Sequence, residues 1–139
     1  MFKNILLPVD LTDRHQPALN TAAELARQGG GEITLLHIVE IIPGLSLDEE
    51  RVFYNRLEKM ARAHLERLGE ELTRQQVPWR LEVRFGHRAP EVAHYARDRG
   101  CDLVVLTSPR PDEDNPAAGW ASLSYKIGLL SPCPVLLVK

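Results

Sequence analysis

Asn4-Ile5-Leu6-Leu7-Pro8-Val9-Asp10 is the stretch of sequence that decides the fold. It is a short apolar run without alternation, the pattern of a strand buried on both faces of a sheet, and it stops at an acid. The same pattern returns at residues 33–39, 102–107 and 133–138. Residues 79–85 instead alternate apolar and polar side chains, which predicts an edge strand with one wet face.

Helical patterns fill the intervals between these strands, at about residues 16–28, 47–76, 89–99 and 121–130. Pro17 suits the first turn of the first helix, and Gly29-Gly30-Gly31 ends it. Ser46 and Glu49 form a plausible capping box for the second. Five strands alternating with four helices predict one α/β domain over residues 1–139. Its Rossmann-like parallel sheet has the order 3-2-1-4-5, with helices on both faces.

In such a sheet, ligands bind outside the carboxyl ends of the strands, where the strand order reverses. That point lies between the first and fourth strands, so the expected walls are Asp10-Leu11-Thr12 and Thr107-Ser108. The last strand lies at an edge and is too apolar to be left bare. We therefore expect a homodimer, paired through Val135, Leu136, Leu137 and Val138.

Composition narrows the class of protein. The 139 residues carry 17 Lys and Arg against 19 Asp and Glu, so the net charge is −2, and we expect neither a nucleic-acid partner nor an anionic membrane surface. No apolar run is long enough for membrane insertion, and Asp10 interrupts the start before a signal-peptide core forms. The two cysteines make no disulfide framework. These features predict a cytoplasmic protein.

No constellation in the sequence points to catalysis. The five histidines lack the spacing of metal ligands, and no cysteine pair joins them, so no metal site is expected. His37, at the end of a buried strand, is predicted to be a hydrogen-bonded structural residue, whereas His87 is left open as a residue of the crevice. No nucleophile has a base that the sequence assigns to it, Ser108 included. We therefore expect no catalytic residue and no enzyme.

The whole chain resembles the universal stress protein family. The matching segments are Ile5-Leu6-Leu7-Pro8-Val9-Asp10, Leu36-His37-Ile38, Gly86-His87-Arg88-Ala89-Pro90-Glu91-Val92, Cys101-Asp102-Leu103-Val104-Val105 and Ser131-Pro132-Cys133-Pro134-Val135-Leu136-Leu137-Val138-Lys139, in the family's order and spacing. The resemblance implies a fold like that of the adenine nucleotide alpha hydrolases and a role in the stress response. A regulatory or transporter partner stays open.

Many members of that family bind ATP through the motif G-x-x-G-x9-G-[ST] after the fourth strand. Here its glycine positions hold Thr107, Arg110 and Ala121, the spacing is one residue longer, and Ser122 is retained. Such a loop brings backbone N–H groups close to phosphate oxygens, which needs bare Cα positions. Pro109 and Pro111 remove two donors, and the acids at 112–114 repel a triphosphate. We expect tight ATP binding to be lost, although Arg110, Ser122 and a helix N-terminus near Ser122 partly offset this.

The adenine side of the family's site is better kept. The resemblance places a nucleotide against Pro8, Val9, Asp10, Leu11, Ile38, Thr107, Ser108, Arg110, Ala121 and Ser122. The family uses an aspartate like Asp10 near the base and the backbone at the position of Ile38, while Leu11 replaces a small residue and narrows the mouth. Asp10 has a second reading, as the residue that fixes the turn into the next helix, and both stay open.

Two functions from different classes follow. The first is a homodimeric stress-response regulator that needs no cofactor and acts through partner contacts without tight ATP binding. The alternative is a nucleotide-binding sensor for ATP or AMP, and a smaller nucleotide such as AMP or a cyclic form would avoid the acidic loop. Receiver and flavodoxin-like domains share the strand–helix pattern, but Phe85-Gly86 and Leu11-Thr12-Asp13-Arg14 lack the residues of their sites.

Overall fold

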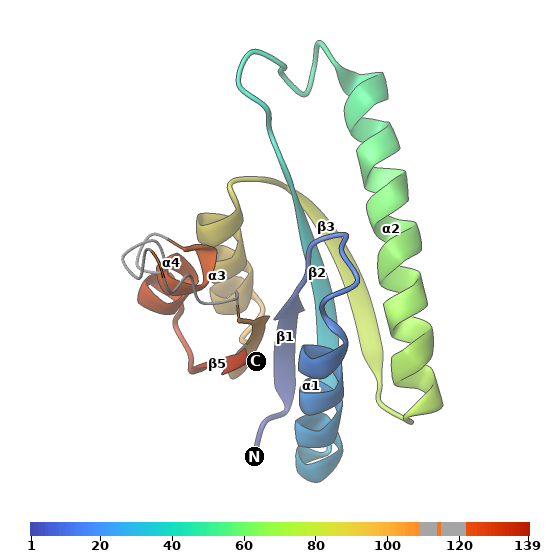
Figure 1. The fold of residues 1–139 in the computed structure, drawn as a ribbon, viewed down its shortest axis with the longest axis vertical. Coiled ribbons are helices and arrows are strands. Elements are labelled where there is room, and N and C mark those ends of the chain that lie inside the picture. Colours follow the sequence, from blue (N-terminus) through green and yellow to red (C-terminus); the bar gives the residue numbers. More distant parts are fainter. Residues whose placement is uncertain (109–113, 115–121) are drawn as a thin grey trace.

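The computed structural model of the chain describes residues 1–108, 114 and 122–139. Within these residues, parallel strands form one sheet in the order β3-β2-β1-β4-β5, which confirms the predicted topology (Figure 1). The strands are β1 (Asn4–Pro8), β2 (Glu32–Glu40), β3 (Trp79–Gly86), β4 (Leu103–Thr107) and β5 (Val135–Val138). The order reverses between β1 and β4, so these two strands frame the switch point of the sheet.

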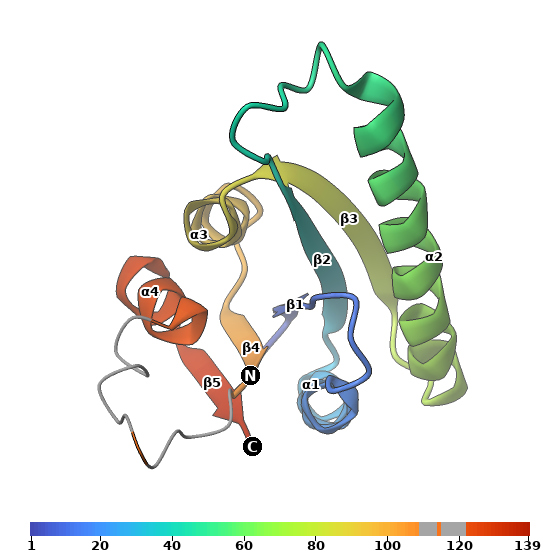
Figure 2. The same cartoon turned by 45° about the horizontal axis from the view of Figure 1, so that its top comes forward.

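The helices lie on both faces of the sheet. They are α1 (Gln16–Gly29), α2 (Arg51–Arg74), α3 (Arg88–Asp98) and α4 (Leu123–Leu130). Figure 2 shows α1 and α2 on one side and α3 and α4 on the other. Each side has its own hydrophobic core, and the strands contribute alternate side chains to the two. Ile5 and Leu7 of β1, for example, face α1 and α2, whereas Leu6 faces α3 and α4.

Helix α1 begins after His15 and ends where the glycines predict. Pro17 lies in its first turn, and Gly30 follows the helix with φ of 66°, a left-handed conformation that glycine adopts without strain. The buried alanines of α1, Ala18, Ala22 and Ala23, let the helix pack closely on β1 and β4. This packing fixes the direction from which His15 approaches the carboxyl ends of those strands.

Helix α2 is shorter at its start than the sequence pattern predicts. Ser46 does accept a hydrogen bond from the backbone N–H of Glu49 at 3.1 Å, but it closes a separate turn, and the helix begins at Arg51. Farther along, α2 packs on β3 at Gly69, where a Cβ would stand 2.3 Å from the Trp79 ring. A side chain at this position would therefore push α2 away from the sheet.

Strand β5 lies at an edge of the described sheet, beside β4. Its central residues Leu136 and Leu137 keep 37% and 44% of their surface exposed, whereas Val104 and Val105 on the neighbouring strand are fully buried. Other large apolar side chains of α4 are exposed as well, Leu129 and Leu130 most of all. Within the described residues, the sheet therefore ends on the apolar edge that the sequence predicts, with side chains of β5 and α4 exposed.

Candidate functional site

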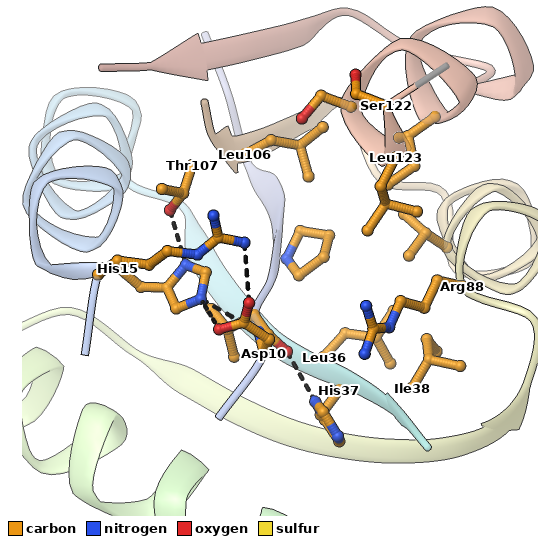
Figure 3. Close-up of a pocket in the computed structure, with 16 residues that line it drawn as sticks. Asp10, His15, Leu36, His37, Ile38, Arg88, Leu106, Thr107, Ser122 and Leu123 are labelled. Atoms are coloured by element: carbon orange, nitrogen blue, oxygen red, sulfur yellow. Dashed lines mark hydrogen bonds and ion pairs between the residues drawn. The ribbon is translucent and has the colours of Figure 1, made fainter. Parts of the chain in front are cut away.

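A cavity of about 120 Å³ lies at the carboxyl ends of β1 and β4, at the predicted switch point. Its walls come from β1, β2, β4, the start of α1, the first turns of α3 and the start of α4. The residues that line it are Pro8, Val9, Asp10, Arg14, His15, Leu36, His37, Ile38, Arg88, Val92, Leu106, Thr107, Ser122, Leu123, Ser124 and Ile127. Figure 3 shows Asp10, His15 and Thr107 on one side, here called the closed wall, and Arg88, Ser122 and Leu123 on the other, here called the open wall.

Asp10 organises the closed wall. Its Oδ1 accepts hydrogen bonds from the Thr12 backbone N–H at 3.0 Å and the Thr12 hydroxyl at 2.5 Å, and it lies 2.6 Å from His15 Nε2. Its Oδ2 pairs with Arg14 Nη2 at 2.8 Å. Burial alone raises the pKa of this carboxyl, but the hydrogen bonds from Thr12 and His15 outweigh it, so the pKa lies well below its ordinary value.

His15 connects the two strand ends. Its Nε2 lies 2.6 Å from Asp10 Oδ1, and its Nδ1 lies 2.7 Å from the Thr107 hydroxyl oxygen (Figure 3). The Asp10 backbone N–H also points at Nε2, at 3.2 Å. The contact with the ionised carboxylate is shorter and charge-assisted, so it decides the tautomer: Nε2 carries a proton and donates to Asp10. His15 is 4% exposed, so this chain of contacts is almost closed to water.

His37 fixes the floor of the cavity at the end of β2. Its Nδ1–H donates to the Val9 carbonyl oxygen at 2.8 Å, which ties β2 to the end of β1. Burial lowers the pKa of this imidazole below its ordinary value, although the Val9 hydrogen bond opposes the shift. His37 is therefore neutral at pH 7, and it is the hydrogen-bonded structural residue that the sequence predicts.

The open wall carries positive charge and the start of a helix. Arg88, the first residue of α3, is exposed, and its ion-pair partner Glu40 lies 3.9 Å away. Ser122 caps α4, since its hydroxyl oxygen accepts from the Tyr125 backbone N–H at 3.2 Å. The next two residues, Leu123 and Ser124, also line the cavity, so the N-terminus of α4 and its positive dipole end face the space.

The structure brings six of the sequence-predicted site residues together. Pro8, Val9, Asp10, Ile38, Thr107 and Ser122 all line the cavity. Leu11 does not narrow its mouth as expected, because its side chain packs against the core on the α1 and α2 side. Ser108 follows β4 and donates its backbone N–H to the Val138 carbonyl oxygen at 2.7 Å. Arg110 and Ala121 lie outside the described residues.

Sequence reasoning missed four polar residues of the cavity: Arg14, His15, Arg88 and Ser124. It gave His15 no role and found no hydroxyl with an assignable base, whereas the structure places the Thr107 hydroxyl against an imidazole that Asp10 orients. The available signal was the position of Arg14 and His15, four and five residues after the strand-end acid. Arg88 stands in the segment that begins at Gly86, where the N-terminus of a helix points to the strand ends.

The described residues contain no cluster of histidine, cysteine and acidic side chains that could hold a metal ion. Within the same part of the chain, no helix combines the length and the apolar character needed to cross a bilayer. Burial raises the pKa of the Cys101 thiol to about 11, so this thiol is an unreactive core residue.

Comparison with known proteins gives the family. The family model described as "Universal stress protein family" matches residues 1–139. Universal stress protein G of Escherichia coli O157:H7 is 31% identical over 144 residues, with both chains covered completely. The structure of universal stress protein UspA from Lactobacillus plantarum superimposes with a TM-score of 0.79 at 20% identity, covering 99% of this chain and 98% of that one. The universal stress protein from Archaeoglobus fulgidus, solved in complex with dAMP, gives 0.75 at 16% identity, covering 99% and 98%. The chain belongs to the universal stress protein family.

Proposed function

We propose that this chain is a homodimeric, non-enzymatic regulator of the stress response whose strand-end cavity binds an adenine nucleotide with a single phosphate in preference to ATP. The observation that carries the proposal is the make-up of the cavity. It combines apolar side chains that suit the faces of a base with an arginine and a helix N-terminus on the open wall. Pockets of this kind, mostly apolar with a few placed polar groups, are typical small-molecule sites.

The base side of the proposed site rests on the ends of β1 and β2. Ile38 and Leu36 from β2, with Leu106 from β4, give an apolar lining; Figure 3 shows Leu36 and Ile38 near His37, and Leu106 next to Thr107. Asp10 Oδ1 already accepts its three contacts from Thr12 and His15, whereas Oδ2 has one, from Arg14. A carboxylate oxygen accepts more than one hydrogen bond, so Oδ2 keeps capacity for the amino edge of a base.

The phosphate side of the proposed site rests on the open wall. Arg88 supplies a full positive charge, and Ser124 with the first backbone N–H groups of α4 supplies donors. One phosphate matches this set. The related structure from Archaeoglobus fulgidus holds dAMP, which also carries one phosphate.

The residues at the end of β4 and after it in the sequence do not favour the binding of a triphosphate. The first backbone N–H after β4, that of Ser108, is committed to Val138 at 2.7 Å, and Thr107 places a side chain where the family's motif has a glycine. Beyond it, the sequence holds two prolines and the acids at 112–114, of which the structure describes Asp114, an exposed residue. Like charges oppose the β- and γ-phosphates of ATP. We therefore expect ATP to bind no more tightly than AMP.

The proposed dimer rests on the edge of β5. Among the described residues, β5 pairs with β4 on one side only, and Leu136 and Leu137 are exposed, so a second copy of the same strand would pair with the edge and cover both side chains. Such pairing about a two-fold axis is self-complementary, the commonest arrangement of homodimers. A bare apolar edge would otherwise invite aggregation.

Calorimetric titration of nucleotide-stripped protein tests the nucleotide. We expect AMP to bind in the micromolar range, with ADP and ATP binding no more tightly. Binding of ATP at least tenfold more tightly than AMP would contradict the proposed preference. If none of the three nucleotides gave heat up to millimolar concentration, nucleotide binding itself would be contradicted. In that case a dimer that acts through partner contacts alone is the function that remains.

Mass measurement by light scattering tests the dimer. We expect twice the chain mass for the wild type and a monomer for Leu137→Glu, because two carboxylates would meet in the paired edge. Val52→Glu is the matched control, since Val52 is also apolar and exposed but lies on α2, far along the chain from β5. A wild-type monomer, or a dimer that Leu137→Glu leaves intact, would contradict pairing through β5.

A further inference from the structure

The two nitrogens of the His15 ring leave two arrangements for the Thr107 hydroxyl. Nε2 carries a proton in both, because it faces the Asp10 carboxylate at 2.6 Å. With no second proton, Nδ1 is an acceptor and holds the hydroxyl proton of Thr107 across 2.7 Å. The Thr107 oxygen then presents only lone pairs to the cavity. With a second proton, Nδ1 donates to that oxygen, and the hydroxyl proton is free to turn into the cavity.

We propose that Thr107 is a specificity-determining residue for the phosphate of the ligand, and that its hydroxyl donates to that phosphate only when His15 carries its second proton. Binding of a phosphate-bearing nucleotide is then coupled to the uptake of a proton by His15. This inference rests on the proposed function, since it concerns how the same cavity recognises the phosphate.

The physical basis is the sign of the charge that the closed wall presents. The lone pairs of Thr107 repel a phosphate oxygen, whereas a hydroxyl donor backed by an imidazolium attracts it. His15 is 4% exposed, so neither effect is strongly screened by water. The ligand anion and the second proton therefore stabilise each other, and each strengthens the binding of the other by the same factor.

The other charged groups around His15 keep their charge in the range above pH 7. Asp10 stays ionised because hydrogen bonds overcome the effect of burial and hold its pKa low. The guanidinium groups of Arg14 and Arg88 also line the cavity. On the strands, burial lowers the pKa of His37, so it stays neutral. On α2, burial and, to a lesser extent, the charge of Arg67 lower the pKa of the buried His64 ring, so it also stays neutral. The charge of His15 acts on this pKa in the same direction. Asp13, beside Arg14, is exposed.

Titration of AMP between pH 7.0 and 9.0 tests the coupling, with adenosine as the ligand that lacks a phosphate. A phosphate monoester is fully ionised over most of this range, since its second pKa is about 6. We expect the Kd of AMP to rise with pH by up to tenfold per unit, while the Kd of adenosine stays constant. Calorimetry in two buffers of different ionisation enthalpy should show that AMP binding takes up as much as one proton.

Two variants assign the effect to the residues. Thr107→Val keeps the shape of the side chain and removes the hydroxyl, so AMP should bind more weakly at pH 7 and its pH dependence should shrink. His15→Gln still reaches a hydrogen bond but gains no charge, so the pH dependence should vanish. His94→Gln removes an exposed histidine of α3 outside the cavity and should keep the wild-type profile.

The possible results separate the two proposals. Binding of AMP with a Kd independent of pH, or a wild-type profile in both Thr107→Val and His15→Gln, overturns the role of Thr107 and His15 and leaves the proposed function standing. Failure of AMP and adenosine to bind at any pH overturns both.

Discussion

Asp10 on the closed wall holds contacts with Thr12, Arg14 and His15 between 2.5 and 3.2 Å, whereas Arg88 on the open wall has its carboxylate partner at 3.9 Å and is exposed. The two walls face the same cavity, yet their polar groups differ in what they bind. On the closed wall they bind one another and fix the turn between β1 and α1. On the open wall they remain able to reach a ligand. Removing the Asp10 contacts of the closed wall should therefore cost stability, whereas removing the Arg88 charge of the open wall should cost affinity for the ligand.

The largest effect should come from Asp10→Asn on the closed wall. The amide keeps the shape but loses the charge that four donors from Thr12, Arg14 and His15 share, and it leaves the buried Nε2–H of His15 with a poorer acceptor. We expect the free energy of unfolding at pH 7 to fall by about 2 kcal/mol, the cost of weakening charged hydrogen bonds at a partly buried site. Urea unfolding measures it, and Asp13→Asn is the control, an exposed acid in the same turn.

Lowering the pH should remove the difference in stability between the wild type and Asp10→Asn. The Asp10 pKa is lowered in the folded protein, so the carboxylate stabilises the fold fully above its unfolded value of 3.8 and loses this effect as the pH falls through the folded value. The gap between wild type and Asp10→Asn should thus be constant from pH 7 to about pH 5 and shrink below pH 4. A gap that stays constant down to pH 3 would mean that the charge of Asp10 does not support the closed wall.

The fold could be predicted because its signals are local. Apolar runs mark the buried strands and glycines end α1, and the predicted strand order rested on this pattern together with the family resemblance. The start of α2 was missed because Ser46 and Glu49 satisfy a capping pattern that a single turn also satisfies. Asp10 was predicted with two roles, and its contacts show that it fixes the turn into α1.

The closed wall could not be predicted in full, because it is made by residues distant in the chain. His15 meets Thr107 across 92 positions, and the sequence alone does not show which strand end the first turn of α1 approaches. The packing of small alanines against β1 and β4 decides that. Arg88 was recognised only as part of a family segment, and its place in the cavity depends on how α3 packs beside β2 and α4.

On the open wall, Arg88→Gln should weaken AMP binding roughly tenfold, equivalent to about 1.4 kcal/mol, and leave the free energy of unfolding nearly unchanged. The Arg88 contact with Glu40 is long and exposed, and such a surface pair contributes little to stability. Adenosine should bind as before, since it has no phosphate. Arg97→Gln, an exposed arginine on the same helix outside the cavity, is the control. Equal losses for AMP and adenosine would place Arg88 at the base rather than at the phosphate.

The smallest effect should come from Ser122, a residue of the open wall whose hydroxyl is hydrogen-bonded within the chain. Its hydroxyl caps α4 through the Tyr125 N–H, and α4 has eight residues with Ile127 as its buried anchor. Ser122→Ala should cost about 1 kcal/mol in the stability of that helix, and Ser122→Thr, which keeps the cap, should cost little. Because the loss is local, hydrogen exchange at the Tyr125 amide should speed up by about fivefold, while global unfolding changes less. If Ser122→Ala instead destabilised the protein as much as Asp10→Asn, the open wall would be part of the core, and the contrast between the two walls would fail.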